Sequence, residues 1–241
     1  MKINIFRFLL FVFLLSIGQF AVAQEERVKK SKKDFLITIT TEFGNIYLLL
    51  YDETPKHKAN FIKLAKKGFY DSLLFHRVID NFMIQGGDPN SKNAKAGERL
   101  GNGDVGYKID AEFVPTIFHR RGVIAAARDG NPQKASSGCQ FYIVQRKPLS
   151  EPEIQQMEAR IGKPIPENQK EVYRKIGGTP HLDMGYSVFG EVIQGMEIVD
   201  KIAATPKDPF DRPQKDIRMS IKVEEIRKKK ITKLFGYQFD K

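Results

Sequence analysis

The fold of this chain is decided by the stretch Phe75-His76-Arg77-Val78-Ile79-Asp80-Asn81-Phe82-Met83-Ile84-Gln85-Gly86-Gly87-Asp88. It contains two short apolar segments joined at a polar pair and closed by a Gly-Gly-Asp turn, which predicts two neighbouring strands. Because successive side chains of a strand point to opposite faces, Arg77 emerges from an apolar row that includes Phe75 and Ile79. Two interpretations fit this pattern: a buried arginine paired with a carboxylate, or a pocket that is apolar on one wall and rich in donors on the other.

The N-terminal residues have the pattern of a signal peptide. Lys2 and Arg7 accompany an apolar run from Phe8 to Ile17, and Ala21-Val22-Ala23 follows it. The alternative, a membrane anchor, needs about 20 apolar residues, and this run is shorter. We therefore predict a signal peptide over residues 1–23 with cleavage near Ala23, no stable membrane insertion after cleavage, and export to a periplasm or secretion.

Composition predicts one domain with additions. The chain has 241 residues, of which 41% are apolar, and a net charge of +11 concentrated near residues 27–33 and 227–230. We interpret these basic clusters as solvated ends rather than a nucleic-acid site, with association to an anionic membrane surface as the alternative. Cys139 is the single cysteine, so no intramolecular disulfide can form, and the four histidines lack metal-site spacing. We expect no metal and no cofactor.

The chain in order predicts an antiparallel β architecture. A polar linker over residues 24–33 leads to a hairpin over 35–50 and a helix that begins near Pro55 and ends at Gly68. Further strands are expected over 121–128, 140–144 and 219–226, with a short helix over 196–202. Closure of the sheet into a barrel would remove its exposed edges.

One segment, about 148–178, departs from this pattern. Ser150 and Glu153 form a capping box that opens a helix to about Ile161, and a second helix is predicted over residues 167–176. This helical hairpin is interpreted as a lid, a partner surface or a tolerated insertion, and the sequence leaves the three open. The basic, aromatic tail over 228–241 has no assigned role.

The opening stretch resembles the signature of the cyclophilin family of peptidyl-prolyl cis/trans isomerases, and the departures from it resemble bacterial exported members. The resemblance covers residues 34–227 apart from the helical insertion. It implies a mainly β domain: a closed antiparallel eight-stranded barrel capped by two helices, here with the helical-hairpin insertion.

The resemblance also implies a set of site residues. Arg77 matches the family's catalytic arginine, while Phe82 and Met83 match its proline pocket and Gln85 its substrate-binding amide. Further substrate-binding positions matched by the resemblance are Ala127, Arg128, Gln140, Tyr142, His181, Leu182 and Tyr186.

Four of these positions depart from the familiar residues, and the departures at His181 and Tyr186 concern cyclosporin binding more than isomerisation. Arg128 stands for an asparagine, Tyr142 for a phenylalanine, His181 for a tryptophan and Tyr186 for a histidine. The hydroxyl of Tyr142 must therefore reach water or a partner.

These features predict a monomeric isomerase that acts on proline-containing polypeptides and accelerates the folding of exported proteins. The alternative is a cyclophilin-fold binding module or holdase chaperone whose catalysis is incidental. The joint presence of Arg77, Phe82 and Gln85 favours the enzyme.

Overall fold

The computed structural model describes residues 31–239. The predicted signal peptide and residues 24–30 of the predicted linker lie outside these residues. The first strand begins at Lys33, so the last residue of the predicted linker belongs to the domain instead. In chain order, the strands and helices of residues 31–239 are β1 (Lys33–Thr41), β2 (Gly44–Leu50), α2 (Pro55–Lys66), β3 (Phe75–Ile79), β4 (Met83–Gly86), η1 (Pro89–Asn93), β5 (Lys108–Ile109), β6 (Val123–Ala126), β7 (Ser136–Ser137), β8 (Phe141–Val144), α3 (Glu151–Ile161), α4 (Glu167–Ile176), η2 (Pro180–Leu182), β9 (Val188–Gln194), α5 (Met196–Ala203), β10 (Ser220–Arg227) and α6 (Lys228–Phe235).

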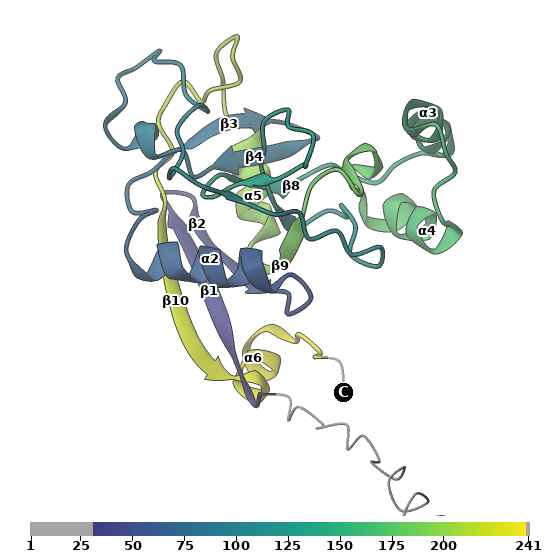
Figure 1. Cartoon of the computed structure of the whole chain (residues 1–241), viewed down its shortest axis with the longest axis horizontal. Coiled ribbons are helices and arrows are strands. Elements are labelled where there is room, and N and C mark those ends of the chain that lie inside the picture. The colour runs from purple at the N-terminus through teal and green to yellow at the C-terminus, as the bar shows by residue number, and fades with distance from the viewer. Residues whose placement is uncertain (1–30, 240–241) are drawn as a thin grey trace, which may run out of the picture. The chain divides into compact units, whose positions relative to one another are not determined.

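Eight strands form one curled antiparallel sheet in the order β10-β1-β2-β9-β6-β8-β4-β3, and β5 pairs separately with β7. The eight strands and their antiparallel direction were predicted, and both are confirmed. Helix α2 lies across the strands, while α3 and α4 stand to one side of them (Figure 1).

The outer strands β3 and β10 do not form a ladder with each other, so the sheet is curled rather than a fully closed barrel. Instead the segment before β10 lies along β3: Phe75 N–H donates to Ile217 O over 3.0 Å, and Val78 N–H donates to Asp211 O over 2.8 Å. Pro213 lies within this segment, and proline cannot donate to a ladder. The edge of β3 is therefore covered by irregular backbone, which still satisfies its hydrogen bonds.

Strand periodicity divides the buried residues into two clusters on opposite faces of the sheet. The larger cluster lies inside the curl and includes Ile84, Ile124 and Ile143, and the smaller lies on the outer face with Met83 and Tyr142. These residues come from β4, β6 and β8, whose neighbouring side chains alternate between the two clusters. A strand buried on both faces reads as a continuous apolar run, which accounts for Val123–Ala126 and Phe141–Val144.

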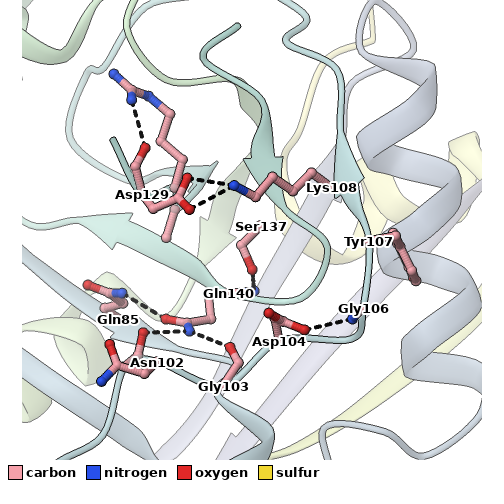
Figure 2. Close-up of a pocket in the computed structure, with 13 residues that line it drawn as sticks. Gln85, Asn102, Gly103, Asp104, Gly106, Tyr107, Lys108, Asp129, Ser137 and Gln140 are labelled. Carbon is pink, nitrogen blue, oxygen red and sulfur yellow. Dashed lines mark hydrogen bonds and ion pairs between the residues drawn. The ribbon is translucent and has the colours of Figure 1, made fainter. Parts of the chain in front are cut away.

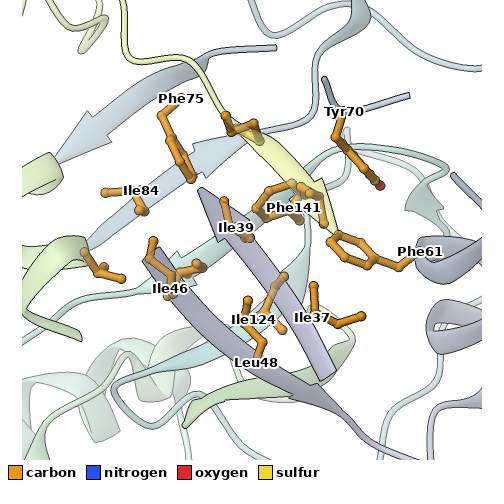
Figure 3. Packing of buried hydrophobic residues seen from close by; sticks show 14 of the residues in the cluster. Ile37, Ile39, Ile46, Leu48, Phe61, Tyr70, Phe75, Ile84, Ile124 and Phe141 are labelled. Atoms are coloured by element: carbon orange, nitrogen blue, oxygen red, sulfur yellow. The ribbon is translucent and has the colours of Figure 1, made fainter. Parts of the chain in front are cut away.

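The interior cluster closes the curl with side chains from the sheet and from both covering helices. Helix α2 contributes Phe61 and α5 contributes Ile202, and each of these side chains is almost fully buried. Figure 3 shows Phe61, Phe75 and Phe141 gathered around the isoleucines of β1 and β2. The predicted helices over 55–68 and 196–202 thus form and cover the sheet.

The insertion forms the two predicted helices, α3 and α4, and the capping box of Ser150 and Glu153 is present. The pair has its own small buried cluster, formed by Leu149, Ile154, Ile165 and Tyr173. The tail, to which the sequence assigned no role, contains a helix. Residues 228–235 form α6, whose Ile231 is fully buried, and the Phe235 ring lies 5.0 Å from the Tyr47 ring.

Candidate active site

Strand register places three of the expected site residues in one row across the outer face of the sheet. Arg77 on β3 pairs with Gln85 on β4, and Gln85 pairs with Tyr142 on β8. The turn between β3 and β4 places Asn81 at a φ of 56°, and its side chain accepts a hydrogen bond from Lys147 N–H over 3.0 Å. The register thus brings one cation, one amide and one aromatic ring to a common surface.

These residues surround a cavity of about 130 Å³. It is called the proline pocket below, after the pocket that Phe82 and Met83 match in the sequence resemblance. Its lining contains every expected site residue except Gln140 and His181, and consists of Arg77, Phe82, Met83, Gln85, Ala127, Arg128, Tyr142, Leu182 and Tyr186. Most of the lining is apolar or aromatic, with the guanidinium groups at its edge. A pocket of this kind can hold a small apolar ring while polar groups orient the chain that carries it.

Arg77 is half exposed and only loosely paired. Its side chain is 42% exposed, and Nε lies 3.6 Å from Oδ2 of Asp211, which also binds Lys207 Nζ at 2.8 Å. The interpretation of a buried arginine locked to a carboxylate is therefore wrong. The guanidinium keeps donors free to approach a bound group.

The floor of the pocket is held by a chain of hydrogen bonds that the sequence did not predict. Tyr142 Oη lies 2.9 Å from His119 Nε2, and His119 Nδ1 lies 2.8 Å from Asp183 Oδ1. Asp183 also accepts from His119 N–H at 2.8 Å and, through Oδ2, from the Tyr173 hydroxyl of α4 at 2.5 Å. With the Nδ1 proton directed at the carboxylate, Nε2 accepts the Tyr142 proton.

Burial keeps the two tyrosine hydroxyls protonated, since it raises the pKa of both Tyr142 and Tyr173 well above the ordinary value. The chain connects the pocket floor to the helical insertion. His119, Asp183 and Tyr173 were absent from the expected site. Tyr142 in place of a phenylalanine was the one signal in the sequence, because a buried hydroxyl needs a partner.

Gln140 lies behind the pocket rather than in its lining. Its Nε2 donates to Gly101 O at 2.9 Å and Gly103 O at 2.8 Å, and its Oε1 accepts from Gln85 Nε2 at 3.1 Å. Gln140 therefore orients Gln85. Beyond it lies a polar cavity of about 680 Å³, across which Lys108 pairs with Asp129 at 2.7 Å (Figure 2).

His181 also lies outside the lining and supports it from behind. Its ring is 5.9 Å from that of Phe82 at an interplanar angle of 23°. The pKa of His181 is lowered to about 4, mainly by burial of the ring and next by the positive charge of Arg160. His181 therefore packs as a neutral aromatic ring at neutral pH.

Arg128 and Tyr186 form the opposite side of the pocket. The guanidinium carbon of Arg128 lies 4.6 Å from the centre of the Tyr186 ring, and its Nε donates to Gly185 O over 2.8 Å. The planar guanidinium is thus fixed by stacking and by backbone rather than by a carboxylate.

Neither a metal site nor a membrane span is found in residues 31–239. Within them, no cluster of His, Cys, Asp and Glu side chains could hold a metal ion, and each helix is too short or too polar to cross a bilayer. Cys139 is buried, and this burial raises the pKa of its thiol to about 11.

Comparison with solved structures identifies the class of protein. A cyclophilin type peptidyl-prolyl cis-trans isomerase from Cryptosporidium parvum superimposes with a TM-score of 0.57 at 25% identity, covering 80% of this chain and 98% of that one. A cyclophilin from Hirschia baltica matches in fold alone, with a TM-score of 0.53 at 18% identity over 78% of this chain and 73% of its own.

Sequence comparison then gives the family. The model of the cyclophilin type peptidyl-prolyl cis-trans isomerase/CLD family matches residues 36–223, and the chain belongs to this family of enzymes. A protein of Staphylococcus saprophyticus provisionally assigned the same activity is 37% identical over 191 residues, which cover 79% of this chain and 91% of that protein. A Streptococcus pyogenes protein provisionally assigned as a bifunctional phosphatase and isomerase is 36% identical over 75% of this chain, and the match spans 37% of its length.

Proposed function

We propose that this enzyme accelerates the folding of exported proteins by isomerising their X-Pro bonds, with Arg77 as the catalytic residue. The observation that carries the proposal is the position of the Arg77 guanidinium, half exposed at the edge of an apolar pocket and in register with Gln85. No covalent bond changes in this reaction, so the site needs only to bind the twisted amide better than the planar one.

The barrier to be lowered is that of amide resonance, about 18–20 kcal/mol. In the twisted state the prolyl nitrogen is pyramidal and regains its lone pair, which a suitably placed donor can stabilise. The guanidinium of Arg77 is permanently charged and carries five N–H donors, so it can hold the preceding carbonyl and approach this nitrogen. Its contact with the nitrogen strengthens only in the transition state, which lowers the barrier.

The remaining pocket residues would hold the proline and its flanking backbone. Phe82, Met83 and Leu182 offer an apolar surface for the proline ring, and Tyr142 closes the floor. Gln85 is oriented by Gln140 and presents an amide to the substrate backbone. The polar and apolar walls together favour an X-Pro segment over a general apolar ligand.

An exchange assay on a short X-Pro peptide tests the mechanism. Arg77→Ala should lower kcat/KM by about 100- to 1000-fold, as expected for loss of one positioned donor. Arg227→Ala removes an exposed arginine of β10 and serves as the matched control, with activity unchanged. An Arg77→Ala protein as active as the wild type would exclude the mechanism.

Export and chaperone activity need separate tests. The signal peptide predicts that cell fractionation finds a mature form beginning near Gln24 outside the cytoplasm, and a full-length cytoplasmic form would contradict export. A holdase activity would suppress aggregation of an unfolded client equally well with Arg77→Ala. Loss of that suppression with the variant would favour the isomerase alone.

The insertion is proposed to modulate access of folded substrates to the pocket. It packs beside η2, which carries Leu182 and precedes Asp183. Deleting residues 150–176 would also remove Tyr173, so the deletion would loosen the pocket floor for every substrate. Exposed charges on the insertion, such as Arg160 and Lys163, give a cleaner test, because their replacement should alter refolding of a protein substrate more than turnover of a peptide.

A further inference from the structure

A second cavity beside the proline pocket is lined by arginines. It measures about 450 Å³ and shares Arg77, Gln85 and Arg128 with the proline pocket, so the two are continuous. Arg99 and Arg212 complete its set of cations. Consecutive Cα atoms of a peptide are about 3.8 Å apart. A peptide whose proline occupies the proline pocket can therefore place the side chain of a neighbouring residue in this second cavity.

The two carboxylates that line this cavity accept hydrogen bonds from backbone N–H groups of their own loops. Glu98 accepts from Lys95 N–H over 2.9 Å, and Asp208 accepts from Phe210 N–H over 2.8 Å and from Arg212 N–H over 3.0 Å. Only these two carboxylates line the cavity, against four guanidinium groups. The lining therefore keeps a net positive charge.

Two of the arginines have no carboxylate partner. Among residues 31–239, neither Arg99 nor Arg128 has a carboxylate oxygen within 4.0 Å, whereas Arg77 lies 3.6 Å from Asp211 and Arg212 lies 2.8 Å from Asp216. Arg99 lies 4.1 Å from the centre of the Phe210 ring, as Arg128 lies over its own aromatic partner. Stacking on a ring fixes the plane of a guanidinium while leaving its edge accessible. The edge of Arg128 already donates from Nε to Gly185 O and from Nη1 to Asp129 O.

Arg212 has a different task. It is 5% exposed, and its Nη1 donates to Lys95 O and Glu98 O while Nη2 binds Asp216 at 2.8 Å. It ties the loop that carries Arg99 to the segment that carries Phe210. Arg99 and Phe210, which stack on each other, therefore lie on two segments that the buried Arg212 side chain holds together.

We propose that this arginine-lined cavity is a subsite for the carboxylate side chain of a substrate residue close to the isomerised proline. The inference rests on the proposed isomerase function. It predicts that the enzyme prefers X-Pro segments with an acidic residue close to the proline. A carboxylate can accept two parallel N–H bonds from the edge of a guanidinium, and the stacked Arg99 is the group positioned to supply them.

The test uses two sets of proline peptides in an exchange assay with the mature protein. One set places Glu, Gln or Lys directly before the proline, and the other places them directly after it. In at least one set, kcat/KM for Glu should exceed that for Gln by about three- to ten-fold at low salt, with Lys lowest. The preference should shrink at high ionic strength, since the site is partly open to solvent.

Arg99→Gln is the decisive variant because Arg99 lies outside the proline pocket. It should bring the Glu-to-Gln ratio close to one while leaving turnover of the Gln peptides unchanged, and Arg227→Gln should keep the wild-type ratio. A ratio of one in both sets, or a preference that survives Arg99→Gln, would overturn the subsite. Absence of turnover on every peptide would instead overturn the isomerase function on which it rests.

Discussion

The floor and the edge of the proline pocket are built in opposite ways. On the floor, Met83 is 2% exposed and Tyr142 5%, and the Tyr142 hydroxyl is bonded into a chain that ends in the insertion. At the edge, Arg77 is half exposed, with a single loose carboxylate partner. Under the proposed function, the difference indicates a division of labour: the floor fixes the shape that would receive the proline ring, and the edge supplies charge that can move toward the prolyl nitrogen. Variants at the edge should change activity without changing stability, and variants beneath the floor should change mainly stability.

After Arg77→Ala, the largest effect is expected from Arg77→Lys, which keeps the charge but removes the planar fork of donors. Because lysine offers a point charge on a flexible stem, kcat/KM should fall by about 10- to 100-fold. The urea midpoint should stay at the wild-type value, since the side chain is half exposed and has one loose carboxylate partner. Full activity with lysine would show that charge alone suffices, and a large loss of stability would break the contrast between edge and floor.

The next effect is expected from Asp183→Ala, which removes the acceptor beneath the floor. His119 and Tyr173 would each retain a buried donor without a partner, at about 1–3 kcal/mol for each unsatisfied group. Urea denaturation should therefore show a loss of at least about 2 kcal/mol, accompanied by a higher KM.

Asp110→Ala is the matched control for that variant. Asp110 forms an exposed pair with Lys56, so its loss should leave the urea midpoint unchanged. Equal stability of the Asp183→Ala and Asp110→Ala proteins would show that the chain beneath the floor is not needed to hold it.

A smaller effect is expected from Tyr142→Phe, which keeps the ring but removes its hydroxyl. His119 Nε2 would lose its partner, and the free energy of unfolding should fall by about 1 kcal/mol. Peptide turnover should stay within about threefold of the wild type, because the ring still closes the floor. A loss of activity beyond that at unchanged stability would mean that the hydroxyl contacts the substrate.

At neutral pH the smallest effect is expected at the His181 ring behind Phe82, and this effect grows as the pH falls. The pKa of His181 is lowered to about 4, first by burial and then by the charge of Arg160, whereas the unfolded chain titrates near 6.5. Stability from this group is complete above pH 6.5 and is lost as the pH falls toward 4, because only the unfolded state then takes up the proton. His181→Phe keeps the stacking and should flatten the loss between pH 6.5 and 4.

Thermal unfolding over that pH range measures the difference. The variant will retain some acid sensitivity, since burial also lowers the pKa of His76 to about 4. An unchanged pH profile would show that His181 is charged or solvated in the folded protein.

The features that sequence predicted are those with a local period or a local cap. Alternation along β3 placed Arg77 and Ile79 on one face, and the capping box at Ser150 located α3. A bulge between Phe75 and Arg77 instead turns Phe75 into the interior cluster, which alternation alone did not predict. Two-residue strands such as β5 are too short to carry a period, and they were missed. Helix α6 was missed because its formation depends on burial of Ile231 against distant strands.

Contacts between distant parts of the chain explain the rest. The bond between His119 and Asp183 joins residues 64 apart, and the curl of the sheet depends on which segment covers β3. Neither leaves a local pattern. Tyr142, at a position expected to hold phenylalanine, indicates only that its hydroxyl has some hydrogen-bond partner. The fold shows that this partner is His119.

The pairing of the first and last strands has a mechanical consequence. In the antiparallel ladder of β1 and β10, Lys33 lies opposite Arg227, so the polypeptide enters and leaves this ladder at the same end. A force that pulls those two points apart would load the hydrogen bonds one pair at a time, as in opening a zipper, instead of loading the ladder all at once in shear. A molecule stretched from these positions should therefore yield first at the seam between β1 and β10, while the strands that carry the pocket are still folded.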